Sequence, residues 1–222
     1  KITGGEAVVR SLIANNTDVV FGLPGAQLDP MFAALHDHQD EIKIIHSRHE
    51  QGCAYMAYGY AEATGRTGTF MVVPGPGLLN AGAAISTGYA CNTPMLCIAG
   101  QGASHLIGKQ LGYLHEIPDQ LAIAKGLVKW ADKISHPAHV PAKIKEGLEK
   151  IREGRKRPVY LELPFDYARL ETTVPDALVA DIQARYPLVD EDQIDSAAKA
   201  LAEAKCPLIM VGGGSKEAGP EV

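Results

Sequence analysis

The sequence lacks the features that mark secreted, membrane-spanning and nucleic-acid-binding proteins. Its 222 residues contain no signal peptide. They also contain no apolar run as long as the roughly 18 residues that cross a bilayer. The formal net charge is −5, so no basic surface favours nucleic acid. We therefore expect a cytoplasmic protein with neither a nucleic-acid nor a membrane partner.

Cysteine is also scarce, and no pair has the Cys-x-x-Cys spacing of a metal or redox site. The neighbours of each cysteine are apolar or small, which predicts buried thiols in a reducing compartment. The four residues are Cys53, Cys91, Cys97 and Cys206.

Nucleotide-binding motifs are incomplete. The segment "PGPGLLNAG" has Gly75 and Gly77 of a dinucleotide fingerprint, but Asn80 stands where the third glycine belongs. No phosphate-binding loop with its Lys-Ser or Lys-Thr pair is present. A dinucleotide-binding protein remains an alternative, although the complete glycine fingerprint of such proteins is missing.

What the sequence does contain is a regular alternation of strands and helices. The runs "TFMVV", "MLCIA" and "VYLEL" are almost wholly apolar, as in parallel strands that helices cover on both faces. We predict an α/β fold with a six-stranded parallel sheet and helices on both faces. The expected strands are 19–22, 42–47, 69–73, 95–100, 129–134 and 159–163, and the expected helices are 3–15, 29–38, 50–64, 78–90, 118–125 and 140–155.

The pattern changes after the last of these strands. We expect a first domain over 1–165 and a proline-containing linker over 166–189. Residues 190–222 restart a helix–strand–glycine pattern, which predicts the truncated start of a second α/β domain. With no initial Met and no capping signal at its end, we expect the chain to be a piece of a longer polypeptide.

Four turns follow expected strands, at 22–27, 47–50, 74–82 and 100–108. In an open parallel sheet, ligands bind at the carboxyl ends of the strands, so all four turns would share the ligand edge. Glycine-rich turns at this position are nevertheless common without any ligand.

Glu50 lies at such a turn, directly before a helix of small residues. It has a simple alternative interpretation as a negative charge that stabilises a helix N-terminus. His46 and His49 are close, but no second cluster of ligands supports a metal, and we expect no metal site. Gly52 and Gly59 inside the helix each cost about 1 kcal/mol relative to Ala. A closely packed second helix, for example from another subunit, would offset that cost and bury Glu50.

Four segments together resemble the pyrimidine-binding domain of thiamine diphosphate enzymes over about residues 1–165. They are "VFGLPGAQLDPMFAAL", "SRHEQGCAYMAYGYAEATGR", "PGPGLLNAGAAISTGYACNTPMLCIAGQ" and "RPVYLELPFD". The similarity is to the acetolactate synthase group, which includes benzaldehyde lyase, benzoylformate decarboxylase and pyruvate oxidase. "AAKALAEAKCPLIMVGGGS" resembles the start of the family's central domain.

The resemblance implies a role for Glu50. In the family, the glutamate at this position hydrogen-bonds N1′ of the cofactor's aminopyrimidine and favours the imino form, which takes the proton from thiazolium C2. Pro24, Gly25, Val73 and Asn80 match positions around the pyrimidine. The helix after Glu50 would then lie at the subunit interface of a homodimer or of a homotetramer built as a dimer of dimers.

The resemblance also implies substrate-side residues. Ala26 and Gln27 stand where benzaldehyde lyase-like relatives face the substrate. His115 stands where relatives carry a catalytic-site Gln near the thiazolium, and Gln110 is the other candidate for that place. His115 is either a proton shuttle or an ordinary loop histidine. Leu114 replaces an aromatic residue usual in acetolactate synthases, which argues against that particular activity.

The family binds the cofactor's diphosphate and Mg²⁺ through a Gly-Asp-Gly…Asn motif that this sequence lacks. The resemblance thus implies that Mg²⁺ is bound by a domain absent from this chain. It leaves FAD open, with no motif here that indicates it.

The predicted function is a thiamine diphosphate-dependent decarboxylase or carboligase that acts on a 2-oxo acid or an aldehyde. One alternative is that the chain is a subunit of a split enzyme. The second α/β domain that starts near residue 190 argues against this, because split enzymes usually end after the pyrimidine domain. Another alternative is a non-catalytic relative, but such a protein would not need a carboxyl group at the position of Glu50.

Overall fold

The computed structural model describes residues 1–181 and 190–221. The chain divides into two compact units, Lys1–Arg185 and Tyr186–Val222. Residues 182–189, the last part of the expected linker, lie outside the described residues.

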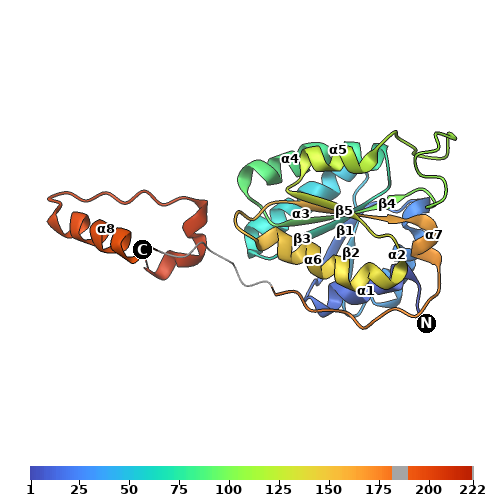
Figure 1. The fold of residues 1–222 in the computed structure, drawn as a ribbon, viewed down its shortest axis with the longest axis horizontal. Helices are drawn as coiled ribbons and strands as arrows, with labels where there is room; N and C mark the ends of the chain where they lie inside the picture. The colour runs from blue at the N-terminus through green and yellow to red at the C-terminus, as the bar shows by residue number, and fades with distance from the viewer. Residues whose placement is uncertain (182–189, 222) are drawn as a thin grey trace. The chain divides into compact units, whose positions relative to one another are not determined.

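The first unit is built on a six-stranded sheet in which all neighbouring strands are parallel (Figure 1). The strand order is β2-β1-β3-β4-β6-β5. The central strands β3, β4 and β6 are buried along their whole length, which is why their sequences are continuous apolar runs. The strands are β1 (Val19–Gly22), β2 (Lys43–Ile45), β3 (Gly68–Val72), β4 (Met95–Gln101), β5 (Trp130–Lys133) and β6 (Val159–Pro164).

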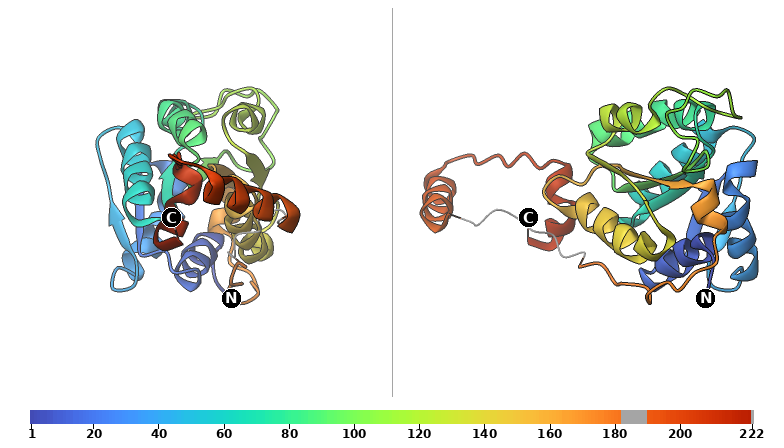
Figure 2. Two further views of the ribbon diagram at one scale, coloured as in Figure 1. Left: turned by 90° about the vertical axis from the view of Figure 1, so that its left-hand side faces the viewer. Right: turned by 45° about the vertical axis from the view of Figure 1, so that its right-hand side comes forward.

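Helices cover both faces of the sheet, as the two further views in Figure 2 also show. One layer contains α1 (Gly4–Ala14), α2 (Asp29–Asp37), α6 (Val140–Arg152) and the short α7 (Phe165–Arg169). The other contains α3 (Glu50–Thr64), α4 (Pro76–Cys91) and α5 (Gln120–Leu127). Each layer forms its own apolar cluster with the sheet, so the predicted α/β fold is confirmed.

Helix α3 lies unusually close to the sheet. A Cβ atom built on Gly68 of β3 would be 2.0 Å from the carbonyl oxygen of Ala57, so a side chain at position 68 would collide with the helix backbone. The buried face of α3 has only small residues besides Glu50: Cys53, Ala54, Ala57 and Ala61. Much of the small-residue composition of α3 therefore serves packing within this chain.

The segment after α7 returns along the first unit. Ile2 pairs with Thr172 in an isolated antiparallel bridge. Asn15 donates to the carbonyl of Leu178 at 2.9 Å and accepts from the backbone N–H of Ala180 at 2.7 Å. Residues up to 181 thus pack on the first unit rather than forming a free connection. The boundaries 1–165, 166–189 and 190–222 remain predictions.

The second unit contains α8 (Glu191–Glu203) and a 3₁₀ stretch at Gly213–Glu221. The strand of the expected helix–strand–glycine pattern is absent from the described residues of this unit, where Leu208 and Met210 are 84% and 90% exposed. The reason is that these described residues offer no second strand for pairing.

The prediction of four buried thiols is only half correct. Cys53 and Cys97 are buried, and burial raises the pKa of the Cys97 thiol far above its usual range. Cys91 and Cys206 are exposed, because Cys91 ends α4 and Cys206 follows α8, none of whose residues is buried. Within the described residues, none of the helices has the length and apolar character that a bilayer crossing demands.

Candidate functional site

The strand order creates a topological switch point between β1 and β3. β2 lies on one side of β1 and β3 on the other, so the connections after β1 and β2 run in opposite directions. Open α/β sheets bind ligands in the crevice at the carboxyl ends of such strands. Gly25 follows β1 and Val73 follows β3, and a Cβ atom on Gly25 would be 2.4 Å from Val73 Cγ1. The structure therefore brings these two predicted site residues into contact.

A tight turn positions Glu50 at the same edge. Ser47 Oγ donates to the carbonyl of His49 at 2.6 Å, and His49 Nδ1 accepts from the backbone N–H of Gln51 at 3.2 Å, which caps α3. A Cβ atom on Gly52 would lie 2.8 Å from Ser47 Oγ. The expectation that a second helix requires Gly52 is therefore wrong, because the Ser47 side chain of the same chain fills that space.

Glu50 is the centre of the predicted pocket. Its side chain is buried, and Oε2 accepts a hydrogen bond from Asn80 Nδ2 at 2.9 Å. A Cβ atom on Gly77 would be 2.6 Å from Val73 Cγ2 and 3.7 Å from Glu50 Oε1. Within the described residues, Oε1 has no hydrogen-bond donor. The turn after β3 and the start of α3 thus hold a carboxyl group with one oxygen paired and the other available to a ligand.

A second pair of predicted residues meets beside this group. Gln27 is buried, its amide Nε2 donates to the carbonyl of Leu114 at 3.0 Å, and its Oε1 lies 3.3 Å from His115 Nδ1. His115 has a left-handed backbone with φ of 67°. Gly75 also has a positive φ, of 56°, and its Cβ would lie 2.4 Å from the His115 carbonyl oxygen. The turn after β3 and the loop after β4 are therefore packed against each other.

A buried polar network behind these turns was not predicted. Gln120 Oε1 accepts from the backbone N–H of Gly75 at 2.8 Å. Its Nε2 lies 3.0 Å from the Gly100 carbonyl, 2.7 Å from Tyr160 Oη and 3.2 Å from Glu162 Oε2. Burial raises the pKa of the Glu162 carboxyl, although the donors Tyr160 and Gln120 oppose that effect. The signal in the sequence was Glu162 itself, an acid within the apolar run "VYLEL".

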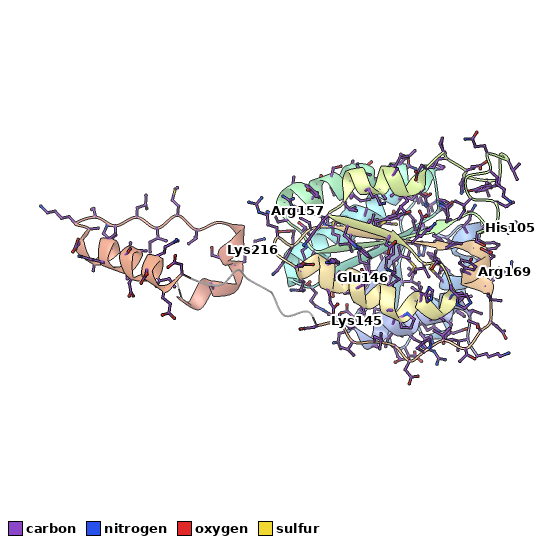
Figure 3. The ribbon with its side chains drawn as sticks, in the orientation of Figure 1. His105, Lys145, Glu146, Arg157, Arg169 and Lys216 are labelled. Carbon is purple, nitrogen blue, oxygen red and sulfur yellow. The ribbon has the colours of Figure 1, made fainter. Side chains whose placement is uncertain are left out.

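The loop between β4 and α5 is attached at its start as well. Ser104 donates to Asp166 through its backbone N–H at 2.8 Å and its hydroxyl at 2.5 Å. Figure 3 shows neighbouring His105 at the same end of the domain as Arg169, which ends α7. The loop that presents His115 is thus held at both of its flanks.

The remaining predicted residues are not joined to this group. Pro24, Ala26 and Gln110 are exposed, and Gln110 has a φ of 53°. No hydrogen bond of a Gln110 side-chain atom is present within the described residues, so its substrate role and that of Ala26 stay predictions. The described parts of the chain also contain no cluster of three His, Cys, Asp or Glu residues that could hold a metal.

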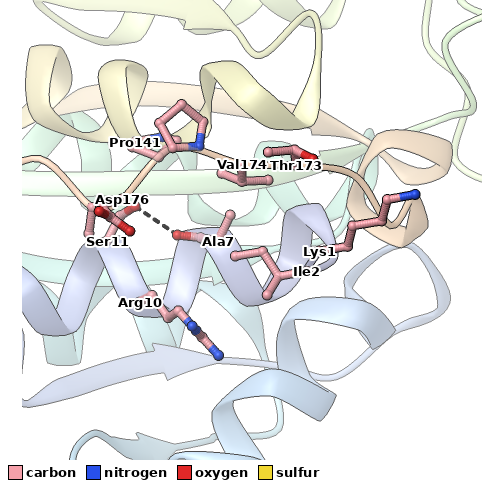
Figure 4. Close-up of a pocket in the computed structure, with 11 residues that line it drawn as sticks. Lys1, Ile2, Ala7, Arg10, Ser11, Pro141, Thr173, Val174 and Asp176 are labelled. Carbon is pink, nitrogen blue, oxygen red and sulfur yellow. Dashed lines mark hydrogen bonds between the residues drawn. The ribbon is translucent and has the colours of Figure 1, made fainter.

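One cavity lies away from the predicted site. It has a volume of about 260 Å³ and lies among Ile2, α1, Pro141 and residues 173–177 (Figure 4). Ser11 lines it, but the Ser11 hydroxyl donates to the Ala7 carbonyl of its own helix at 2.7 Å. None of the predicted site residues lines this cavity.

A buried carboxyl group paired with an amide, beside closely packed glycines at the switch point of a parallel sheet, is typical of a cofactor-binding α/β domain. A family model described as "Thiamine pyrophosphate enzyme, N-terminal TPP binding domain" matches residues 2–123, more than half of the chain. The chain belongs to this thiamine pyrophosphate enzyme family, and the resemblance predicted from the sequence is confirmed.

Curated relatives match nearly all of the chain. A probable 2-ketoarginine decarboxylase, AruI, of Pseudomonas aeruginosa is 34% identical over 98% of this chain and 39% of its own length. The acetolactate synthase large subunit of Haemophilus influenzae is 35% identical over 97% of this chain and 38% of its own length. The acetolactate synthase isozyme 3 large subunit of Escherichia coli is 33% identical over 98% and 38%. The chain therefore spans about two fifths of the length of these relatives.

Proposed function

We propose that this chain is the pyrimidine-binding part of a thiamine diphosphate-dependent enzyme that decarboxylates a 2-oxo acid or joins it to an aldehyde. The observation that carries the proposal is the arrangement of Glu50 and Asn80 at the switch point, where Gly77 packs closely against Val73. The residues fit the aminopyrimidine, because Glu50 presents a carboxyl oxygen, Oε1, that has no hydrogen-bond donor within the described residues and can serve a ring nitrogen. Gly25 and Gly77 both pack directly against the Val73 side chain, where a Cβ atom would lie only 2.4 and 2.6 Å from its methyl groups, so a larger residue at either position would displace Val73.

The chain's own residues perform defined tasks in this proposal. Asn80 fixes one oxygen of Glu50, so that Oε1 faces the ligand. Through Oε1, Glu50 would exchange a proton with the ring nitrogen of a bound aminopyrimidine. When bound, thiamine diphosphate would supply the carbon nucleophile for the substrate carbonyl. His115, in the loop packed on Gly75, lies beside this group and exchanges a proton with the substrate.

The rest of the enzyme lies outside this chain in our proposal. A diphosphate-binding domain with the family's Gly-Asp-Gly…Asn motif would hold Mg²⁺, as the family resemblance implies. We keep a cytoplasmic location as part of the proposal and leave FAD open. The substrate is a small 2-oxo acid or aldehyde, and the relatives' names suggest 2-ketoarginine as the first substrate and acetolactate as the first product to test.

The test compares residues 1–222 with the whole polypeptide that carries them. With thiamine diphosphate, Mg²⁺ and a panel of 2-oxo acids, the whole polypeptide is expected to release CO₂ and residues 1–222 alone are not. CO₂ release by the isolated chain would contradict the proposal that the diphosphate and Mg²⁺ are bound outside residues 1–222. A whole polypeptide that binds the cofactor but acts on no 2-oxo acid or aldehyde would favour the non-catalytic alternative, and activity only after addition of a separate chain would favour the split enzyme.

We also propose a homodimer, or a dimer of such dimers, that forms through the outer surface of α3 and α4. This α3–α4 surface exposes Tyr55, Leu79 and Tyr89, which are 38%, 52% and 37% exposed. Gly59 lies on it, and within the described residues a Cβ atom there meets nothing within 4 Å. An interior helical glycine with open space beside it costs stability for no reason within the chain.

Gly59→Leu is expected to convert the dimer to a monomer or an aggregate, because overpacking of an interface typically costs about 1–3 kcal/mol or more. Sedimentation velocity measures the change. Gly126→Leu in α5 is the matched control, since a Cβ atom at Gly126 also meets nothing within 4 Å. An unchanged dimer for Gly59→Leu would exclude this surface as the interface.

A further inference from the structure

The orientation of the Gln27 amide follows from its partner. The Leu114 carbonyl can only accept a hydrogen bond, so the amide nitrogen of Gln27 must be the atom that faces it, at 3.0 Å. The side chain is only 7% exposed. A Cβ atom on Gly100 would lie 3.0 Å from Gln27 Cβ, so Gln27 is packed tightly against the end of β4. With Nε2 committed to Leu114, Oε1 is the atom that faces His115.

This orientation decides which nitrogen of His115 carries a proton. Gln27 Oε1 has no hydrogen to donate, so His115 Nδ1, 3.3 Å away, must be the donor. The neutral imidazole then has its proton on Nδ1 and a free lone pair on Nε2. Among the described residues no hydrogen bond to Nε2 is present, so this nitrogen is available to a ligand.

The backbone around His115 holds the ring in place. His115 has a left-handed φ of 67°, which residues other than glycine adopt when their surroundings enforce it. Its carbonyl oxygen packs against Gly75, and the Gly75 N–H is bound by Gln120. Gln27 therefore contacts a loop that is already constrained, and its amide bridges the Leu114 carbonyl and the His115 ring.

We infer that Gln27 is a positioning residue that holds His115 in the Nδ1–H tautomer and makes Nε2 the nitrogen that gives and takes the proton. A second proton on the ring adds at Nε2, and the contact between Nδ1–H and Gln27 is the same in the neutral and the charged ring. In this inference Gln27 contacts His115 and does not contact the substrate, which is the role that the family resemblance implied for it. That the proton passes to or from a 2-oxo acid or aldehyde rests on the proposed function.

The tautomer is measured directly by NMR on the chain with ¹⁵N-labelled histidine. The ¹⁵N shifts and the long-range couplings to the ring protons show which nitrogen carries the proton. The chain has eight histidines, so His115→Gln identifies the His115 signals by their loss. The expected result is protonated Nδ1 and bare Nε2 for neutral His115. A wild-type spectrum with the proton on Nε2 would overturn the inference without any variant.

Substitutions of Gln27 test whether its amide oxygen is what keeps the proton on His115 Nδ1. Gln27→Met keeps the length but accepts no strong hydrogen bond, so His115 is expected to shift toward the Nε2–H form that free imidazole favours in water. Gln27→Glu keeps an oxygen opposite Nδ1 and is expected to retain the proton there. Leu114→Ala is the control, since the Leu114 side chain is 61% exposed and its carbonyl remains. A folded Gln27→Met protein with an unchanged Nδ1–H signal would contradict the inference.

Activity separates this inference from the proposed function. In the whole enzyme, Gln27→Met is expected to lower kcat about 10²-fold, within the range of general acid–base catalysis. If the Nδ1–H form is found but His115→Gln keeps the wild-type rate, the shuttle role of His115 fails while the tautomer assignment stands. If Nε2 carries the proton in a fully active enzyme, the assignment fails while the proposed function stands.

Discussion

Glu50→Gln is expected to slow turnover of the whole enzyme by roughly 10²–10⁴-fold, the usual contribution of general acid–base catalysis. Glutamine has the same length, and its oxygen can still accept the hydrogen bond from Asn80 that now measures 2.9 Å. Its amide can also donate to a ring nitrogen, so folding and thiamine diphosphate binding should change little. What the amide lacks is an exchangeable acidic proton, and only catalysis needs that proton.

Three measurements distinguish these effects. Isothermal titration gives the cofactor affinity, steady-state kinetics with a 2-oxo acid give kcat, and NMR in deuterated buffer gives the exchange rate of the cofactor's C2 proton. Exchange should slow in parallel with kcat. Glu146→Gln in α6, on the opposite face of the sheet, is the matched control and should behave as wild type (Figure 3). Wild-type exchange and turnover for Glu50→Gln would leave Glu50 as a charge at a helix N-terminus only.

Gln120→Leu is expected to lower the free energy of unfolding by about 2–5 kcal/mol, because it removes the partner of several buried polar groups at once. The backbone N–H of Gly75 loses its acceptor, and the Gly100 carbonyl and the carboxylate of Glu162 lose a donor. Leucine adds apolar volume but satisfies none of them. Urea unfolding of residues 1–222 measures the change, with Gln39→Leu at an exposed position as the control.

The loss in unfolding free energy caused by Gln120→Leu, here called the deficit, should depend on pH. Burial already raises the pKa of Glu162 above its usual value of 4.5, so ionised Glu162 weakens the fold. That penalty is present above the folded-state pKa and disappears as the pH falls below the unfolded value. Removal of the Gln120 donor raises the pKa further. The deficit is therefore expected to be largest at neutral pH and to shrink toward pH 4.5. A deficit that is equal at both pH values would show that Glu162 carries none of the loss.

Short-range patterns made much of this domain predictable. The expected bounds of β1 and α3 agree with the structure, because each depends on a local apolar run or on a helix with a glycine after its end. β2 was predicted over 42–47 but contains only Lys43–Ile45, since it is an edge strand with a single neighbour. The six-stranded parallel sheet also followed, because continuous apolar strands need helices on both faces.

The candidate site was predictable in part. Glu50, Gly25, Val73 and Asn80 could be named from the turns that follow strands and from the family resemblance. Their common place at the β1–β3 switch point could not, because it depends on β2 and β3 lying on opposite sides of β1. Gly52 is a second residue that the sequence could not explain. Glycine is needed there because the Ser47 hydroxyl lies across a tight turn and leaves no space for a side chain.

The sequence by itself determined the class of fold, the ligand edge and the carboxyl group placed there, because strands, helices and turns are encoded by residues close together in the chain. Only the tertiary structure decided which distant side chains meet. Gln27 and His115 are separated by 88 positions, and Gly75 and Gln120 by 45, yet each pair shares a contact. Such pairs depend on strand order and loop packing. These are determined by the free energy of the whole buried core, so a local sequence pattern cannot predict them.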